Sequence, residues 1–215
     1  MYVAIEGVIG VGKTTLARLL QNSFYAEILL EVFEENPFLS DFYSDRERYA
    51  FQTQIFFLLS RYHQQRRTVQ SLMSTGRNLL ADYTFAKDAL FARINLRGDE
   101  LDMYYKVHEA LAEKIERPDL LVYLQATTDT LMQRIALRDR PYERQMERSY
   151  IHELNLAYQD FFSKPFDHTP VLTIETDHLN IIQNPEHLRW IENRIRQSIN
   201  LPPFQQTLPL PETSH

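Results

Sequence analysis

Eight residues near the start of the chain constrain its fold more than any other segment. Residues 7–14 read GVIGVGKT and fit the pattern G-x-x-x-x-G-K-[ST]. They directly follow a short apolar run, residues 2–6, and directly precede an apolar-periodic segment, residues 14–24. We expect a strand, a glycine-rich turn and a helix in that order, which is the arrangement that holds phosphate groups. Backbone N–H groups turn inward around the phosphate, and the helix presents its positive end to it.

A chance match in a flexible loop is the alternative interpretation of this motif. The chain contains only five glycines, and three of them lie here, which favours the phosphate-binding interpretation. Lys13 is placed to bridge the β- and γ-phosphates, and the Thr14 hydroxyl to ligate Mg²⁺. The motif predicts a bound nucleoside triphosphate but does not by itself identify a kinase. The residues expected to bind this nucleotide are Gly7, Gly10, Val11, Gly12, Lys13, Thr14 and Thr15.

Short apolar runs alternate with helical patterns along the rest of the chain. Each run is continuous and not alternating, which is typical of a parallel sheet buried on both faces. The predicted fold class is α/β, with a parallel five-stranded sheet and helices on both faces. We expect a single domain over residues 1–200 and a Pro-rich tail over 201–215. The expected strands are residues 2–6, 28–33, 78–82, 119–124 and 171–175, and the expected helices are 14–24, 46–73, 85–94, 101–115, 128–137, 149–162 and 186–199.

Composition and charge exclude several classes of protein. An apolar content of 44% excludes a disordered chain, and no apolar run approaches the roughly 20 residues of a membrane helix. The net charge of −6 argues against a nucleic-acid polymer as partner but leaves room for a single nucleotide. There is no cysteine, no metal-ligand spacing among the histidines and no G-x-S-x-G. With a strand beginning at Tyr2 and no room for a signal peptide, we expect a cytoplasmic protein.

Two carboxylates are expected at the carboxyl ends of strands, where ligands of parallel sheets bind. Glu31 opens the acidic run EVFEE at the end of the expected strand 28–33. It could accept the proton of an attacking hydroxyl, or simply belong to a solvated acidic turn. Asp82 ends the expected strand 78–82 and could hold Mg²⁺, or cap the segment that follows.

Arginines are concentrated in one stretch of this otherwise acidic chain. Those spaced four apart would share a helical face. Guanidinium groups match phosphate oxygens, so a mobile lid at about residues 138–148 could stabilise the charge of a phosphoryl group in transfer. A solvated helix paired with neighbouring acidic residues is the alternative. The arginines are Arg134, Arg138, Arg140, Arg144 and Arg148.

The long helical pattern over residues 46–73 carries both aromatic and polar side chains. Its aromatic residues could line a pocket for a flat base, or could pack in the core. Gln54 and Arg61 are seven residues apart and so lie on one helical face. Two polar groups on one face of an otherwise apolar helix predict a buried recognition pair, with a partly exposed edge as the alternative.

Together these segments resemble the deoxynucleoside kinase family, which includes bacterial deoxyadenosine and deoxyguanosine kinases, from Tyr2 to about Ile199. Residues 5–15 look like the family's I-E-G-x-I-G-x-G-K-[ST]-T. Residues 31–33 look like its E-P-V, whose Glu is the general base; Val32 replaces Pro, which leaves Glu34 as the alternative to Glu31. The spacing of Tyr43 and Gln54 matches the family's Tyr, which holds the sugar 3′-hydroxyl, and its Gln, which pairs with the base edge.

The resemblance implies further substrate contacts. Arg61 and Asp88 match an Arg and an Asp of members that accept purines or cytosine, and a carboxylate accepts from an exocyclic amine but repels the thymine carbonyl. Glu143 matches a lid Glu that reaches the 3′-hydroxyl, and Arg138 and Arg140 match the lid arginines. Residues 176–180, with Asp177, look like the loop that meets the ATP adenine.

The sequence departs from the family pattern at one place. The family's [DE]-R-S after the third strand appears here as Asp82-Tyr83-Thr84. The arginine that usually helps to hold the 5′-oxygen and the phosphates is therefore absent. Either another arginine compensates, or activity is lower, or substrate choice is altered.

The resemblance implies a P-loop kinase fold with an arginine-rich lid and the ATP- and Mg²⁺-dependent 5′-phosphorylation of a deoxyribonucleoside. The implied catalytic residues are Glu31, Lys13, Arg138 and Arg140, with Thr14 and Asp82 at the metal. It also implies a homodimer formed through the helix at 46–73 and the helix after the third strand.

Three other functions stay open at this point. A nucleoside monophosphate kinase would need basic groups where the acidic run 31–35 lies. A nucleotide-hydrolysing switch would be expected to carry a guanine-reading N-K-x-D, which the sequence lacks. A catalytically inactive sensor would account for Tyr83 in place of the arginine.

Overall fold

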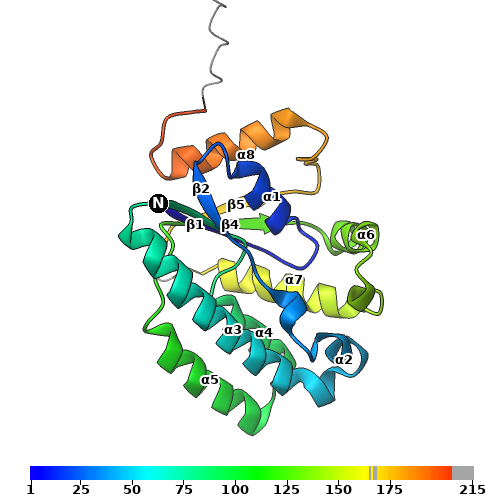
Figure 1. Ribbon diagram of the computed structural model, residues 1–215. Helices are drawn as coiled ribbons and strands as arrows, with labels where there is room; N and C mark the ends of the chain where they lie inside the picture. The colour runs from blue at the N-terminus through cyan, green and yellow to red at the C-terminus, as the bar shows by residue number, and fades with distance from the viewer. Residues whose placement is uncertain (165, 167–168, 205–215) are drawn as a thin grey trace, which may run out of the picture.

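The computed structural model describes residues 1–164, 166 and 169–204. Within these residues the strands form one parallel sheet in the order β2-β3-β1-β4-β5 (Figure 1). The sheet confirms the predicted α/β class and the parallel direction of its five strands. The strands are β1 (Tyr2–Glu6), β2 (Ala26–Leu29), β3 (Asn78–Ala81), β4 (Leu120–Gln125) and β5 (Val171–Glu175).

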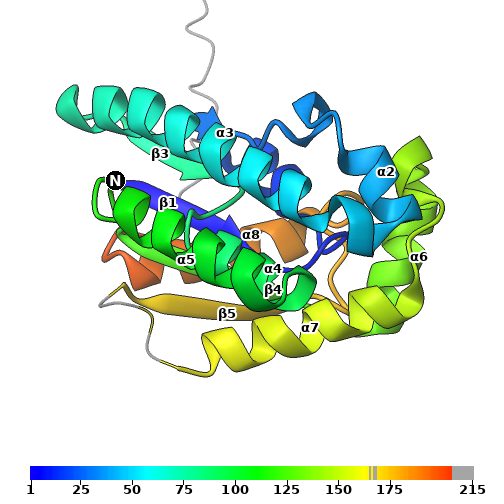
Figure 2. The same cartoon turned by 90° about the horizontal axis from the view of Figure 1, so that it is seen from below.

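Helices cover both faces of the sheet, as the continuous apolar strands require. Figure 1 shows α1 and α8 on one face and α3, α4, α5 and α7 on the other. In Figure 2 the second group crosses the sheet side by side. The helices are α1 (Lys13–Leu20), α2 (Leu39–Ser44), α3 (Arg46–Ser74), α4 (Lys87–Asn95), α5 (Gly98–Ala112), α6 (Thr128–Arg138), α7 (Arg148–Phe162) and α8 (Pro185–Ser198), with 3₁₀ turns η1 (Phe33–Glu35) and η2 (Pro141–Glu143).

The core is centred on β1, which lies between β3 and β4. Val3 pairs with Leu80 on one side and Leu120 on the other. Every residue of β1 is buried, whereas the edge strand β5 alternates between buried and exposed residues. In the strand order β2-β3-β1-β4-β5, the chain leaves β1 toward β2 on one side and leaves β3 toward β4 on the other side. The loops at the carboxyl ends of β1 and β3 therefore run in opposite directions. A crevice at such a point is where ligands of open α/β sheets bind.

Local sequence signals set the ends of the long helices. The Asp45 side chain accepts a hydrogen bond from the backbone N–H of Arg48 and caps α3. The helix then runs through 29 residues without Gly or Pro. It ends where Gly76 adopts a positive φ of 69°, a conformation that costs glycine little.

Several predicted boundaries were wrong. The second strand ends at Leu29, because the chain leaves the sheet there and turns into η1, so Glu31 lies beyond the strand and not within it. The first helix ends at Leu20. The six-residue helix α2 was not predicted, because it is too short to show a helical period.

The arginine stretch is also not one helix. Helix α6 ends at Arg138, and Asp139 adopts a left-handed conformation with a φ of 47°. Arg140 and Arg144 flank η2, and Arg148 is the first residue of α7, so these three arginines do not share a helical face as predicted. Residues 205–215 of the expected tail lie outside the described residues. Among the described helices, none is long and apolar enough to cross a membrane.

Candidate active site

The glycine motif forms a tight turn between β1 and α1, which we call the glycine cradle (residues 7–14). Gly7, Gly10 and Gly12 have positive φ angles of 146°, 89° and 108°. A Cβ atom on Gly7 would lie 2.5 Å from the carbonyl oxygen of Leu124. A Cβ atom on Gly10 would lie 2.7 Å from Cγ1 of Ile135. These two positions therefore require glycine. No side chain caps the start of α1, which leaves its first N–H groups to an anion.

Lys13 begins α1 and turns back over the cradle. Its Nζ donates hydrogen bonds to the carbonyl oxygens of Gly7 at 2.6 Å and Val8 at 3.2 Å. Burial, together with the positive charge of Lys87, lowers the pKa of Lys13 to about 8. The carboxylates of Glu6, Glu31 and Asp82 lie near enough to oppose that shift. A bound anion would raise this pKa again, because it favours the charged ammonium.

A second cavity adjoins the far side of the cradle. It is lined by residues of the cradle and α1, including Val11, Gly12 and Thr15, and by the loop after β5. In that loop Asp177 accepts hydrogen bonds from the backbone N–H of Thr127 at 3.0 Å and from its hydroxyl at 2.8 Å. The predicted nucleotide-binding residues Val11, Thr15 and Asp177 thus line one continuous space.

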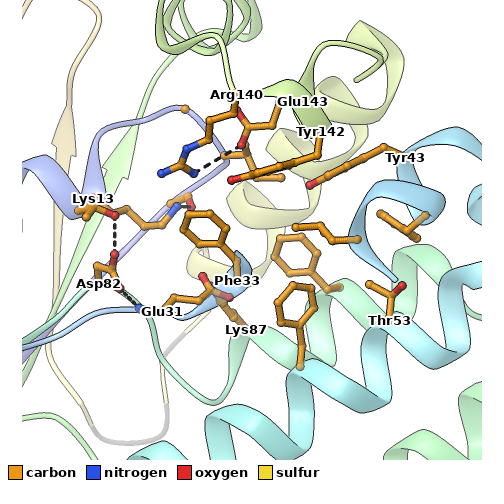
Figure 3. Close-up of a pocket in the computed structure, with 18 of the residues that line it drawn as sticks. Lys13, Glu31, Phe33, Tyr43, Thr53, Asp82, Lys87, Arg140, Tyr142 and Glu143 are labelled. Carbon is orange, nitrogen blue, oxygen red and sulfur yellow. Dashed lines mark hydrogen bonds and ion pairs between the residues drawn. The ribbon is translucent and has the colours of Figure 1, made fainter. Parts of the chain in front are cut away.

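The main cavity opens on the near side of the cradle and extends between α2, α3, α4, α7 and η2 (Figure 3). Aromatic rings form much of its wall, as suits a flat ligand. Phe57 is the member of the predicted aromatic stripe on α3 that reaches this wall, and Phe51 packs against the core. The aromatic lining residues are Phe33, Phe42, Tyr43, Phe57, Phe91, Tyr142, Tyr150 and Tyr158.

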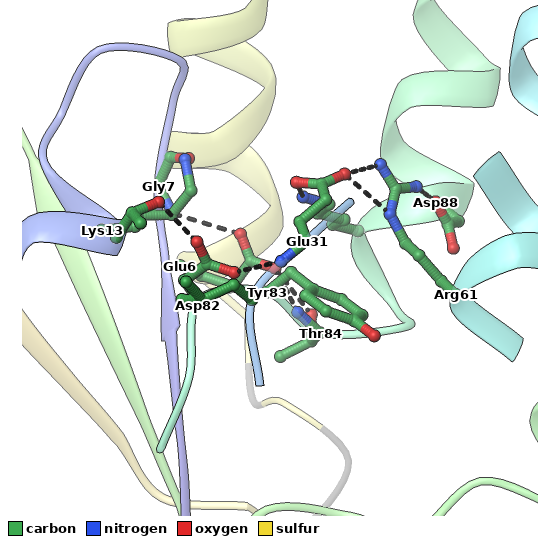
Figure 4. Close-up of polar contacts among 12 residues, drawn as sticks. Glu6, Gly7, Lys13, Glu31, Arg61, Asp82, Tyr83, Thr84 and Asp88 are labelled. Atoms are coloured by element: carbon green, nitrogen blue, oxygen red, sulfur yellow. Dashed lines mark hydrogen bonds and ion pairs between the residues drawn. The ribbon is translucent and has the colours of Figure 1, made fainter. Parts of the chain in front are cut away.

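Four charged side chains form what we call the charge cluster: Glu31, Arg61 and Lys87, which line the main cavity, and Asp88. Figure 4 shows Arg61 between Glu31 and Asp88. One oxygen of Glu31 accepts from Nε of Arg61 at 2.9 Å, and the other accepts from Nζ of Lys87 at 2.6 Å. Arg61 also pairs with the fully buried Asp88. Burial would raise the pKa of Glu31, but the charges and hydrogen bonds of Arg61 and Lys87 hold it well below its ordinary value.

Asp82 connects the cradle to the charge cluster. One of its oxygens accepts from the Thr14 hydroxyl at 2.5 Å, and the other accepts from the backbone N–H of Glu31 at 2.8 Å. The Thr14 hydroxyl and the Asp82 carboxylate are hard oxygen ligands. Mg²⁺ is usually bound by one or two such protein groups together with phosphates and water. These two residues therefore fit a Mg²⁺ site beside the phosphates, although the described residues hold no cluster of three or more His, Cys, Asp or Glu ligands.

The loop between α6 and α7 closes one side of the main cavity. Glu143, 5% exposed, accepts from Nε of Arg138 at 3.0 Å, and Arg140 lies 3.7 Å from the same carboxylate. The guanidinium of Arg140 also lies over the ring of Phe33, 4.2 Å from its centroid. Burial raises the pKa of Tyr43 well above its ordinary value, so Tyr43 keeps its proton.

The structure separates the predicted lid arginines into two groups. Arg138 and Arg140 line the main cavity. Arg144 and Arg148 form ion pairs with Asp139 and Asp129 on the surface, which is the alternative that the sequence left open for the whole stretch. Tyr43, Gln54 and Glu143, predicted to hold the acceptor, also line the main cavity.

Tyr142 and Lys87 are among the residues of the main cavity that were not predicted from the sequence. Tyr142 of η2 stacks on Tyr43, with ring centroids 6.5 Å apart and planes at 11°. Lys87 reaches Glu31 from the first residue of α4. The expectation that another arginine compensates for the one absent at Tyr83 stays a prediction; the cations beside Glu31 are Arg61 and Lys87. The spacing of Lys87 from Tyr83, four residues, was the available signal.

The side chain of Glu34, the alternative to Glu31, is outside the part of the chain that the structure describes. Tyr83 is fully buried and its hydroxyl donates to the Gln64 side chain at 2.7 Å, so it points away from the cradle and fills space under Lys87.

The glycine cradle with Lys13 can hold the phosphates of a nucleotide, and the Thr14–Asp82 pair lies beside it. Across the shared crevice lies the carboxylate of Glu31. This arrangement defines a P-loop kinase acting on a small acceptor. The chain belongs to the deoxynucleoside kinase family, whose model matches residues 3–200. It is therefore a deoxynucleoside kinase, and the resemblance noted in the sequence is confirmed.

Individual relatives agree with this assignment. The chain is 33% identical to a deoxyguanosine kinase of Bacillus subtilis over 201 residues, covering 92% of this chain and 97% of the relative. It is 32% identical to a deoxyadenosine kinase of Dictyostelium discoideum, covering 94% of this chain and 84% of the relative. The fold is similar to that of deoxyadenosine kinase from M. mycoides with bound dATP, with a TM-score of 0.79, 24% identity and coverage of 91% and 99%.

Proposed function

We propose that this protein transfers the γ-phosphoryl group of ATP to the 5′-hydroxyl of a deoxyribonucleoside, with purine or cytosine bases preferred over thymine. One observation carries the proposal. Asp82 holds the Thr14 hydroxyl of the glycine cradle and the backbone of Glu31 at the same time, so a phosphate site and a carboxylate that can activate an alcohol share one crevice.

On the donor side, the glycine cradle binds the phosphates of ATP through its N–H groups and Lys13. The adenine lies in the second cavity near Asp177. Arg138 and Arg140 lie close enough to the main cavity to neutralise charge on the γ-phosphoryl oxygens. Thr14 and Asp82 would hold Mg²⁺, which when bound adds positive charge at the phosphates.

On the acceptor side, Glu31 orients the 5′-hydroxyl and receives its proton. Tyr43 and Glu143 hold the 3′-hydroxyl. Gln54, Arg61 and Asp88 read the base: Asp88 can accept from an exocyclic amine, and Arg61 can donate to a ring nitrogen or a carbonyl. The names of the relatives support a purine preference, because they are deoxyguanosine and deoxyadenosine kinases.

A nucleoside monophosphate kinase is the nearest rival, and the charge cluster disfavours it. The cluster contains two cations, Arg61 and Lys87, but also two carboxylates, Glu31 and Asp88. Its formal charge is therefore balanced, and it offers no surplus of positive charge to an acceptor that already carries a phosphate.

The test is a panel of the common ribo- and deoxyribonucleosides, together with dAMP and dGMP, each supplied with labelled ATP. We expect 5′-phosphorylation of a purine deoxyribonucleoside, with kcat/KM at least about 100-fold above that of thymidine, because a carboxylate facing the thymine carbonyl is left unpaired. Labelling of dAMP in place of deoxyadenosine would support the monophosphate kinase. Steady ATP hydrolysis at a rate that no nucleoside changes would support a nucleotide-hydrolysing switch. The absence of any phosphoryl transfer would support an inactive sensor.

We also propose a homodimer in the cytoplasm. The resemblance implies a dimer formed through α3 and the helix after the third strand, α4, which within one chain packs among α3, α5 and α7. The neighbouring helices α3 and α5 present exposed apolar side chains, Leu59 and Met103. Light scattering should give twice the mass of one chain, and a charged residue at Met103 should halve it.

A further inference from the structure

Lys87 is a buried cation at the centre of the site to which neither the sequence motifs nor the family pattern assigns a role. Lys87 is the first residue of α4, and its side chain is 5% exposed. Its Nζ lies 2.6 Å from Glu31 and 5.6 Å from the centroid of the Tyr83 ring. Figure 3 shows it on the wall of the main cavity, across from Lys13. Removing an ammonium from water is costly, so its position needs a reason beyond packing.

The two cations beside Glu31 are held differently. Arg61 uses two donors on one oxygen of Glu31 and pairs with Asp88 on its other side, so it is fixed from both directions (Figure 4). Lys87 approaches the second oxygen of Glu31 through one ammonium at the end of a flexible chain. Of the two, Lys87 is the cation that can move away from Glu31 without breaking a second ion pair.

Such movement would favour the chemistry, because it makes Glu31 a stronger base. A hydroxyl that gives its proton to Glu31 must first donate a hydrogen bond to one of the two carboxylate oxygens. One oxygen accepts from Arg61 and the other from Lys87. A carboxylate held by two cations is also a weak base, and the pKa of Glu31 is held low for this reason. The oxygen that accepts only from Lys87 can accept a second hydrogen bond from the hydroxyl, and moving Lys87 away would make Glu31 a stronger base.

We propose that Lys87 is the cation that acts at the 5′ end of the acceptor, in the position left without an arginine by Tyr83. This inference rests on the proposed function. The acceptor hydroxyl takes the Glu31 oxygen that Lys87 holds, and the Lys87 ammonium moves onto the oxygens at the reacting centre. The O5′–Pγ bond forms, the bond from Pγ to the β,γ-bridging oxygen breaks with its electron pair on ADP, and the hydroxyl proton passes to Glu31.

The electrostatics of the cradle support this placement. Lys13 and Lys87 both line the main cavity, and the positive charge of Lys87 lowers the pKa of Lys13. Lys13 bonds to the cradle carbonyls on the donor side, and Lys87 bonds to Glu31 on the acceptor side. A phosphoryl group passing between them would have a cation on each side, which is the preorganised arrangement that favours charge developing in a transition state.

The absence of cysteine from the chain allows a chemical test. A Lys87→Cys variant carries one thiol, and alkylation with bromoethylamine in denaturant followed by refolding restores an ammonium of nearly the same length. We expect the variant to lose about 100-fold in kcat with the KM for ATP changed by less than about threefold. Aminoethylation should raise the kcat of the variant by at least about tenfold. Lys114→Cys, at an exposed position on the surface, is the matched control and should keep wild-type kcat before and after alkylation.

The outcomes separate this inference from the proposed function. A wild-type protein that phosphorylates no nucleoside refutes the proposed function itself. An active wild type whose Lys87→Cys variant keeps kcat within about threefold refutes only the role of Lys87. A loss that aminoethylation does not recover, or a parallel loss of ATP binding, would show that Lys87 supports the fold. Lys87→Met fills the same space without charge and supplies the same comparison of kcat and KM should the cysteine variant not fold.

Discussion

The glycine cradle and the charge cluster lie within one crevice but are built on opposite principles. The cradle is one continuous segment whose shape depends on backbone angles and on the absence of side chains at Gly7 and Gly10. The charge cluster is assembled from long charged side chains on three separate segments: the loop after β2, α3 and α4. The first can recognise phosphate by itself, whereas the second depends on the whole tertiary structure.

Their charge states differ in the same way. In the cradle the Lys13 ammonium bonds to neutral carbonyl oxygens, so its charge is available to a ligand. In the cluster each cation already faces a carboxylate. The donor side is therefore prepared for an anion, and the acceptor side for a neutral, polar molecule. Three measurements test this difference between the two sides of the crevice.

The largest effect is expected from Glu31→Gln, which should slow phosphoryl transfer without weakening ATP binding. Removing the base should lower kcat roughly 1000-fold, because general base catalysis contributes about 10²–10⁴-fold. The dissociation constant of ATP, measured by calorimetry, should change by less than about threefold, since the cradle is left intact. Glu27→Gln, in which the same change falls on a surface pair with Arg77, is the matched control. Full turnover in Glu31→Gln would move the role of base to Glu34.

An intermediate effect is expected from Gly7→Ala, which should distort the glycine cradle, where ATP is proposed to bind. The new Cβ would meet the Leu124 carbonyl oxygen at 2.5 Å, at a φ of 146°. The strain, about 1–3 kcal/mol, should either unfold part of the cradle or weaken ATP binding by about 10- to 100-fold.

Gly76→Ala provides the comparison for that variant. Gly76 also has a positive φ, 69°, but a Cβ there would meet no atom within 4 Å. We expect about 1 kcal/mol less stability and unchanged ATP affinity. Equal effects of the two substitutions on ATP affinity would mean that the cradle tolerates a side chain at Gly7.

The smallest effect is a pH dependence confined to the donor side. With the pKa of Lys13 lowered to about 8, free enzyme loses this charge as the pH rises through that value. The kcat/KM for ATP, which reports on free enzyme, should fall about tenfold between about pH 7 and pH 9. Once ATP is bound, its negative charge raises the pKa of Lys13, so kcat should decline only at higher pH. A kcat/KM that stays flat across this range would contradict the lowered pKa.

The same contrast explains what the sequence could predict. The cradle was identified from eight contiguous residues, because its function resides in local backbone geometry. The sheet followed from continuous apolar runs, which report burial on both faces. The end of β2 was wrong because Leu30 and Val32 are apolar residues outside the sheet, and hydrophobicity alone does not mark where a strand stops pairing.

Less of the acceptor side could be predicted from the sequence. Gln54 and Arg61 could be placed together because they share a helical face, but nothing local indicates that Arg61 bridges Glu31 and Asp88. Lys87 was missed for the same reason, since its partner lies 56 residues away in the chain. Tyr142 belongs to a three-residue 3₁₀ turn, too short to show a period, and its stacking on Tyr43 depends on how that turn folds back.

Asp82 has a consequence for how the enzyme aligns its substrates. Each of its oxygens is bonded to a different half of the crevice, through Thr14 and through the amide of Glu31. A single carboxylate therefore joins the glycine cradle to the loop that carries Glu31 before any substrate binds. In the proposed function, this link would fix the spacing between the phosphate site and the proposed base.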